Sequence, residues 1–152
     1  MTFWTPPTNE MVEKVLASVK KETDREYFFS RLNNPLWIEP LYKSGYFSDP
    51  LGKKVLPGGY VQYPYWPELS YLVAIAEEAP DQVVKIVLSL PETNNPRVYE
   101  DALSIALKLK GQQSAKLLPK LIEYIKLDDF FLPIVIPHYS NIGWNKATLP
   151  KR

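Results

Sequence analysis

The sequence contains no cysteine and a single histidine, His138. Without cysteine, a disulfide framework, a thiolate metal site and a thiol nucleophile are all excluded. A zinc or nonheme iron site needs several His, Cys or carboxylate ligands, so we expect no metal site. No Ser or Asp partner stands in a recognisable motif around His138. We therefore interpret this histidine as a structural or surface residue rather than a general base.

Long hydrophobic runs are also missing. The longest run, 130–136, is interrupted by Pro133 and is far shorter than the ~20 residues that cross a bilayer. Residues 1–8 lack the basic stretch and apolar core of a secretory signal. Together with the absence of cysteine, these features predict a cytoplasmic protein that does not associate with membranes.

Neither sign of charge dominates. Lys and Arg number 18 against 17 Asp and Glu, and the formal net charge of +1 provides no field that would attract nucleic acid or acidic substrates. Two glycine motifs bind phosphates, G-x-x-x-x-G-K-[ST] and G-x-G-x-x-G, and neither follows a strand in this sequence. No nucleotide or other cofactor is therefore expected. The carboxylate pairs Glu77-Glu78, Glu100-Asp101 and Asp128-Asp129 are interpreted as solvated charges, because adjacent residues on a helix point in different directions. We identify no catalytic residue.

The composition is typical of one globular domain: 45% of the 152 residues are hydrophobic and 23% are charged. Helix boundaries are well marked. Thr8 is predicted to cap a first helix, and the T-x-x-E pattern of Thr23 and Glu26 predicts the start of a second. Proline suits the first turn of a helix, whose N–H groups have no internal partner. Further helices are predicted to begin at four prolines, Pro35, Pro67, Pro80 and Pro96.

Glycine and proline also predict where helices end or bend. Gly45 and Gly111 follow apolar helical segments and suit left-handed C-terminal caps. Pro119 lies inside the segment 112–127, whose leucines and isoleucines fall on one stripe. We expect a helix there with a kink near Pro119, because proline cannot donate to the helical ladder.

One stretch, 48–66, has a different pattern. Pro57-Gly58 suits a type II turn between two short strands, so a small hairpin or an ordered loop is predicted. Its aromatic residues could cover the end of the helices or form a partner-binding surface. Covering is favoured, since isolated hairpins are only marginally stable and need a surface to lie against. The candidate partner-binding residues are Tyr60, Tyr63, Tyr65 and Trp66.

The chain repeats with an offset of 31 residues. Shifting the sequence against itself by 31 residues, here the 31-residue slide, aligns residues 71–87 with 102–118 without a gap. Pro80 then aligns with Gly111, and Lys85 with Lys116. The same offset separates Leu-Pro-Lys at 118–120 from its second copy at 149–151. Each block is an apolar helix, a tight break and an amphipathic helix, the pattern of an α-solenoid.

In these residues the chain resembles the HEAT and armadillo class of helical repeats. The resemblance implies an all-α fold, an α-α superhelix of HEAT-like helix pairs with one small hairpin or loop insertion. We predict a single domain over 1–152, with an insertion at 48–66 and either a partial repeat or a cap at 128–152. The predicted helix pairs cover 8–47, 67–90 and 96–127.

The resemblance also implies a function: a non-catalytic scaffold that binds a protein or peptide, as an N-terminal module of a longer multidomain protein. A nucleic-acid-binding solenoid is the alternative. Lys85 and Lys116 occupy matching positions and, with Lys120, could form a column that tracks phosphates. A solvated outer helix face explains the same lysines more simply. A small enzyme with an unrecognised site is a third hypothesis, which no motif supports.

Overall fold

A computed structural model describes residues 3–127 of the chain. These residues form eight α-helices, one turn of 3-10 helix and one two-stranded antiparallel sheet, so the predicted helical fold with a small hairpin is confirmed. The helices are α1 (Asn9–Ser18), α2 (Glu22–Arg31), η1 (Pro35–Trp37), α3 (Ile38–Lys43), α4 (Pro67–Ile75), α5 (Pro80–Ser89), α6 (Pro96–Lys108), α7 (Gln112–Lys116) and α8 (Leu118–Leu127). The strands are β1 (Lys54–Val55) and β2 (Val61–Gln62).

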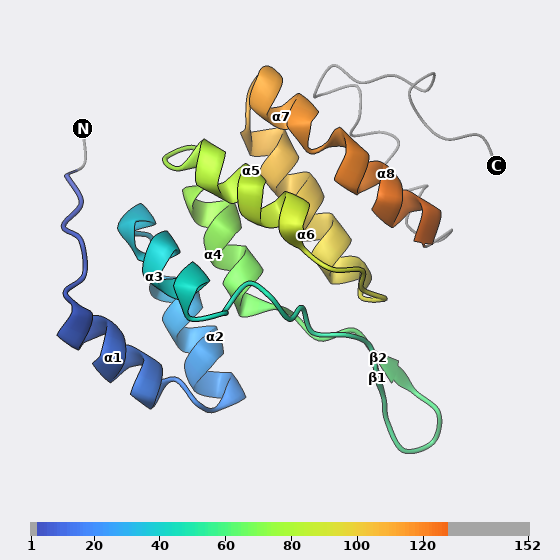
Figure 1. Cartoon of the computed structure of the whole chain (residues 1–152). Coiled ribbons are helices and arrows are strands. Elements are labelled where there is room, and N and C mark those ends of the chain that lie inside the picture. Colours follow the sequence, from blue (N-terminus) through green and yellow to red (C-terminus); the bar gives the residue numbers. More distant parts are fainter. Residues whose placement is uncertain (1–2, 128–152) are drawn as a thin grey trace.

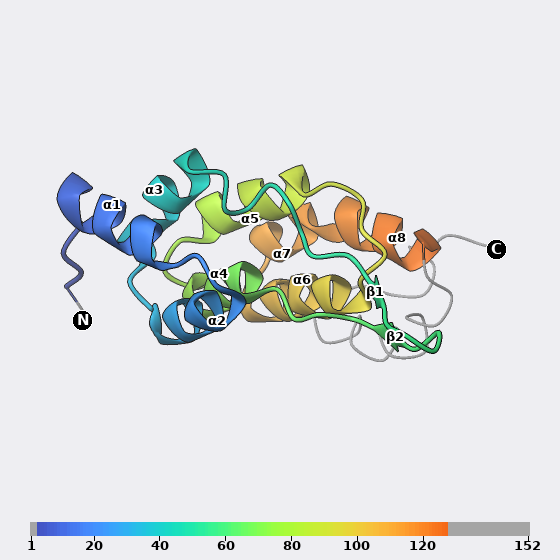
Figure 2. The same ribbon diagram turned by 90° about the horizontal axis from the view of Figure 1, so that it is seen from below.

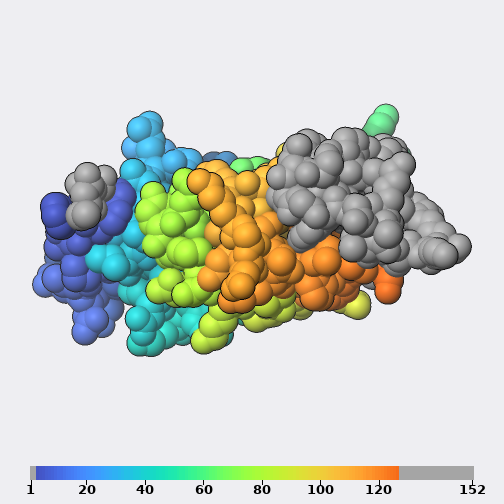
Figure 3. Space-filling model, turned by 90° about the horizontal axis from the view of Figure 1, so that it is seen from above, coloured from blue at the N-terminus to red at the C-terminus, as the bar shows by residue number. Residues whose placement is uncertain are grey.

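The helices form two layers. In one layer α2 packs against α4 and α4 against α6. The other layer contains α3, α5 and α7, with α5 packed against α7 (Figures 1 and 2). Successive helices advance in chain order along the long axis of the molecule (Figure 3). Consecutive helices from α2 to α7 therefore lie in opposite layers (Figure 2).

Most of the predicted helix starts are observed. The hydroxyl of Thr8 accepts from the Met11 N–H at 3.2 Å, and prolines occupy the first turns of η1, α4, α5 and α6. The prediction that Thr23 and Glu26 form a capping box is wrong. Helix α2 begins at Glu22 after Lys21, which makes no side-chain cap, and Thr23 lies within the first turn. In this register Arg25 donates to Glu68 and the ring of Phe29 lies beside Tyr71, both on α4.

The two predicted glycine caps differ. Gly45 has a φ of +81°, and the Gly45 and Tyr46 N–H groups donate to the Tyr42 and Leu41 carbonyls at 3.1 Å each. This is a Schellman motif, as predicted. Gly111 has a positive φ of 57° but a ψ of −125°, and it precedes α7, while Leu109 caps α6. The prediction of a left-handed cap at Gly111 is therefore wrong.

The core lies between the two layers. Leu72 and Leu103, which the 31-residue slide aligns, are both buried, and so are Val83 and Ser114, which it also aligns.

The kink predicted near Pro119 is a complete break between two helices, because α7 ends at Lys116 and α8 begins at Leu118. Pro119 lies in the first turn of α8, where its missing N–H has no cost.

Several predictions fall outside the described residues. These are the partial repeat or cap at 128–152, the second Leu-Pro-Lys at 149–151 and the interpretation of His138. They remain predictions.

Candidate partner-binding surfaces

The predicted hairpin is present at 54–62. Val55 pairs with Val61 across the antiparallel strands, and the Leu56 N–H donates to the Tyr60 carbonyl at 2.7 Å. The Gly59 N–H donates to the Leu56 carbonyl at 3.1 Å, and Gly58 has a φ of +89°. Both features are those of the predicted type II turn, in which the third residue needs a positive φ.

The hairpin projects away from the helices and does not lie across them (Figure 1). Both strands are exposed on both faces, and Tyr60 is 74% exposed. The favoured interpretation, that the aromatic residues cover the helical stack, therefore does not apply to most of them. The exposed large apolar side chains of this region are Val55, Leu56, Tyr60, Val61, Tyr63 and Tyr65.

Trp66 differs from the three tyrosines. It is 1% exposed, belongs to the hydrophobic core and immediately precedes α4. Its indole Nε1 has no hydrogen-bond partner among the described residues. Of the four aromatic residues predicted to bind a partner, Trp66 is thus the one that covers the helices, and Tyr60, Tyr63 and Tyr65 are accessible.

The base of the hairpin is held by two asparagines that precede α6. The buried amide of Asn95 donates to the carbonyls of Leu51 at 2.7 Å and Pro64 at 2.6 Å, one on each side of the hairpin. The Asn95 side-chain oxygen accepts from the Arg97 N–H at 3.1 Å and so caps α6. Asn94 accepts from the Lys53 N–H at 2.9 Å. The start of α6 therefore fixes where the hairpin leaves the stack.

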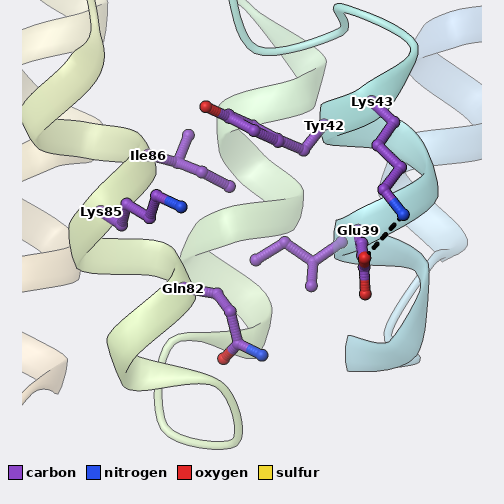
Figure 4. A pocket seen from close by; sticks show the side chains of 7 residues that line it. Glu39, Tyr42, Lys43, Gln82, Lys85 and Ile86 are labelled. Carbon is purple, nitrogen blue, oxygen red and sulfur yellow. Dashed lines mark ion pairs between the residues drawn. The ribbon is translucent and has the colours of Figure 1, made fainter.

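A second surface, which the sequence did not indicate, is a groove between α3 and α5 of about 330 Å³ (Figure 4). Its floor is apolar, formed by Ile38 and Ile86, both of which are buried. The remaining lining residues are Glu39, Tyr42, Lys43, Gln82 and Lys85. The groove joins side chains of α3 and α5 that lie 39 to 48 positions apart in the sequence, so no local pattern could reveal it.

The groove carries one cation, Lys85, that is not paired with any carboxylate in the described part of the chain. Glu39 and Lys43 form an ion pair along α3 at 2.7 Å, which lowers the pKa of the Glu39 carboxyl. The ammonium group of Lys85 lies 5.9 Å from the centre of the Tyr42 ring, a cation–π geometry. None of the carboxylates in residues 3–127 forms an ion pair with Lys85.

The three lysines of the predicted phosphate-tracking column have different environments. Lys85 and Lys116 are exposed on the neighbouring helices α5 and α7. Lys120 is 7% exposed, and its ammonium donates to the Leu90 carbonyl at the end of α5. It also lies 5.3 Å from the ring of Tyr124. Lys120 therefore cannot belong to an open cationic face, because the Leu90 carbonyl and the ring of Tyr124 engage its charged group.

Buried polar groups occur elsewhere in the stack. Glu68 on α4 is fully buried and accepts from the Arg25 Nε at 3.0 Å, which joins α2 to α4. Burial raises the pKa of Glu68, and Arg25 opposes the increase. Burial also raises the pKa of Asp101 on α6 to about 6. Within residues 3–127, no cluster of His, Asp and Glu side chains is suited to hold a metal ion.

Comparisons with known proteins identify no relative. No family model matches the chain, and neither curated proteins nor solved structures show significant similarity to it. None of the helices between residues 3 and 127 is both long and apolar enough to span a bilayer. The function has to be inferred from the two surfaces themselves.

Proposed function

We propose that this chain is a non-catalytic helical-repeat scaffold that binds a protein or peptide, with HEAT-like helix pairs stacked into an α-α superhelix. The observation that carries the proposal is the projecting hairpin with exposed Tyr60, followed by exposed Tyr63 and Tyr65 in the segment that returns to α4, while Asn95 holds the base. Two layers of alternating helices support the repeat arrangement.

An exposed apolar hairpin is unfavourable for a chain that has no binding partner. Two-stranded hairpins are only marginally stable in water, and their apolar side chains gain nothing while solvated. Tyrosine anchors interfaces well, because it combines a large contact area with a polar tip and few rotatable bonds. The asparagine contacts hold the hairpin in place before binding, which reduces the entropy lost on association.

An affinity-capture experiment tests the proposal. The wild-type chain and the Tyr60→Ser/Tyr63→Ser variant are immobilised, captured proteins are identified by mass spectrometry, and each is then purified and titrated against both chains. We expect at least one partner whose Kd rises by about 100-fold in the double variant, which corresponds to two interface anchors of about 1–2 kcal/mol each.

Tyr27→Ser is the matched control. Tyr27 is also an exposed tyrosine, but it lies on α2 away from the hairpin. It should leave the Kd unchanged. The proposal fails if no purified partner distinguishes the hairpin variant from Tyr27→Ser, or if the hairpin variant is unfolded by circular dichroism at the assay temperature.

A further inference from the structure

We propose that the groove between α3 and α5 binds a short extended segment of a partner protein in which an acidic residue lies two positions from an aliphatic one, because residues two apart in an extended segment share one face. This inference rests on the proposed function, because it assigns to a protein-binding scaffold a second contact and the chemistry of the segment bound there. The hairpin and the groove are separate regions of the surface and can be tested independently (Figures 1 and 4).

The apolar part of the segment is indicated by the floor of the groove. Ile38 on α3 and Ile86 on α5 both line it. Tyr42 extends from α3 toward Ile86 (Figure 4). Their apolar atoms would bury an aliphatic side chain placed between them. A volume of about 330 Å³ is near the lower limit for ligand pockets. It suits one or two side chains of a peptide better than a large cofactor.

The acidic part is indicated by Lys85. Of the three charged groups that line the groove, Glu39 and Lys43 neutralise each other at 2.7 Å. Lys85 forms no ion pair with any carboxylate of residues 3–127, and its ammonium group lies 5.9 Å from the centre of the Tyr42 ring. Among these residues the groove therefore has one positive charge without a paired carboxylate, beside an apolar floor. An aliphatic side chain and a carboxylate on the same face of the segment complement both features at once.

The backbone of the segment has a partner as well. Gln82 lies one helical turn before Lys85 on α5, lines the same groove and makes no side-chain hydrogen bond with the rest of residues 3–127. A side-chain amide both donates and accepts, so it can pair with the N–H and carbonyl of an extended peptide. A single Lys with one neutral amide is a poor match for the continuous phosphates of a nucleic acid, which need many cations.

The test uses fluorescence anisotropy with a labelled peptide, the leucine-glutamate peptide, that repeats leucine, serine, glutamate and serine, so that leucine and glutamate share one face of the extended chain. Matched peptides replace glutamate by lysine or leucine by serine, and a labelled single-stranded oligonucleotide is the fourth probe. We expect the leucine-glutamate peptide to bind more tightly than the other three and to weaken as NaCl is raised. Amide chemical shifts should move in α3 and α5.

The decisive variants are Lys85→Glu and Lys116→Glu. They change the charge equally on adjacent helices, but only Lys85 lines the groove. Lys85→Glu should weaken the leucine-glutamate peptide by about tenfold or more, and Lys116→Glu by less than about twofold. Equal effects of both variants, equal binding of the lysine peptide, or tighter binding of the oligonucleotide would overturn the inference. A partner captured through Tyr60 would still leave the proposed function standing in that case.

Discussion

The side-chain amide of Asn95 lies 2.6 Å from the carbonyl oxygen of Pro64, a residue that precedes it by 31 positions. The same amide nitrogen also donates to the Leu51 carbonyl, so one buried group holds both ends of the hairpin insertion. Because Asn95 also caps α6, the position of the hairpin is coupled to the start of that helix. The exposed tyrosines are thereby presented from a fixed base.

Asn95→Asp tests this coupling. The substitution keeps the size and the capping oxygen but removes both donated hydrogen bonds, and it places a carboxylate oxygen against two carbonyls. We expect the free energy of unfolding to fall by about 2–4 kcal/mol. Urea denaturation measures that loss, and hydrogen exchange should show faster exchange of the Leu56 and Gly59 amides than in the wild-type chain.

Asn94→Ala is the control for Asn95→Asp. Asn94 neighbours it in sequence but makes one exposed bond, to the Lys53 N–H at 2.9 Å. Its loss should cost about 0.5–1 kcal/mol. If both variants lost the same stability, Asn95 would have no special part in holding the hairpin.

Substitutions of Trp66 and Tyr60 should show which of these aromatic residues stabilises the fold and which is free to bind a partner. Trp66 is 1% exposed in the core, so Trp66→Ala should lower the free energy of unfolding by about 3–5 kcal/mol. Tyr60→Ser removes a side chain that is largely in solvent, and its effect should stay within about 0.5 kcal/mol. Chemical denaturation of both variants checks this. A large loss in Tyr60→Ser would mean that the hairpin packs on the domain after all.

Asp101 should make stability depend on pH. Burial raises the pKa of its carboxyl from 3.8 to about 6, so the folded chain holds this proton more tightly than the unfolded chain. The contribution of Asp101 to the free energy of unfolding is therefore highest below pH 4 and decreases as the pH rises through about 6. Asp101→Asn should be more stable than wild type by about 1–2 kcal/mol at neutral pH.

The difference between Asp101→Asn and wild type should disappear toward pH 4, where the wild-type carboxyl is protonated in the folded chain. Thermal or urea denaturation across pH 4–8 measures it. Glu13→Gln is the control, because Glu13 is an exposed carboxylate on α1 that does not act on the pKa of Asp101. A gain in Asp101→Asn that is independent of pH would contradict the assignment to the buried charge.

Lys120 and Lys116 provide a fourth comparison. The ammonium of Lys120 donates to the Leu90 carbonyl, which is the C-cap of α5, and Lys120 is buried. Lys120→Ala should destabilise the chain by about 1–3 kcal/mol through the lost bond and the lost packing of its aliphatic stem. Exposed Lys116→Ala should change the free energy of unfolding by less than about 0.5 kcal/mol. Similar values would show that Lys120 has no structural role.

The sequence alone determined the helix boundaries where local chemistry decides them. Thr8, the four prolines at the starts of η1, α4, α5 and α6, and the Pro57-Gly58 turn act through their own backbone restrictions, so their roles can be recognised without a fold. The 31-residue slide likewise identified Leu72 and Leu103 as equivalent buried positions.

Only the tertiary structure decided which of the predicted site residues are accessible. Trp66 and Lys120 are buried although the nearby Tyr65 and Lys116 are exposed, and what buries them is the packing of other elements, which spacing along the chain does not encode. The groove between α3 and α5 and the two bonds of Asn95 join residues more than 30 positions apart. Such contacts depend on how the layers stack, and for that reason the sequence predicted the helices but not the surface they form.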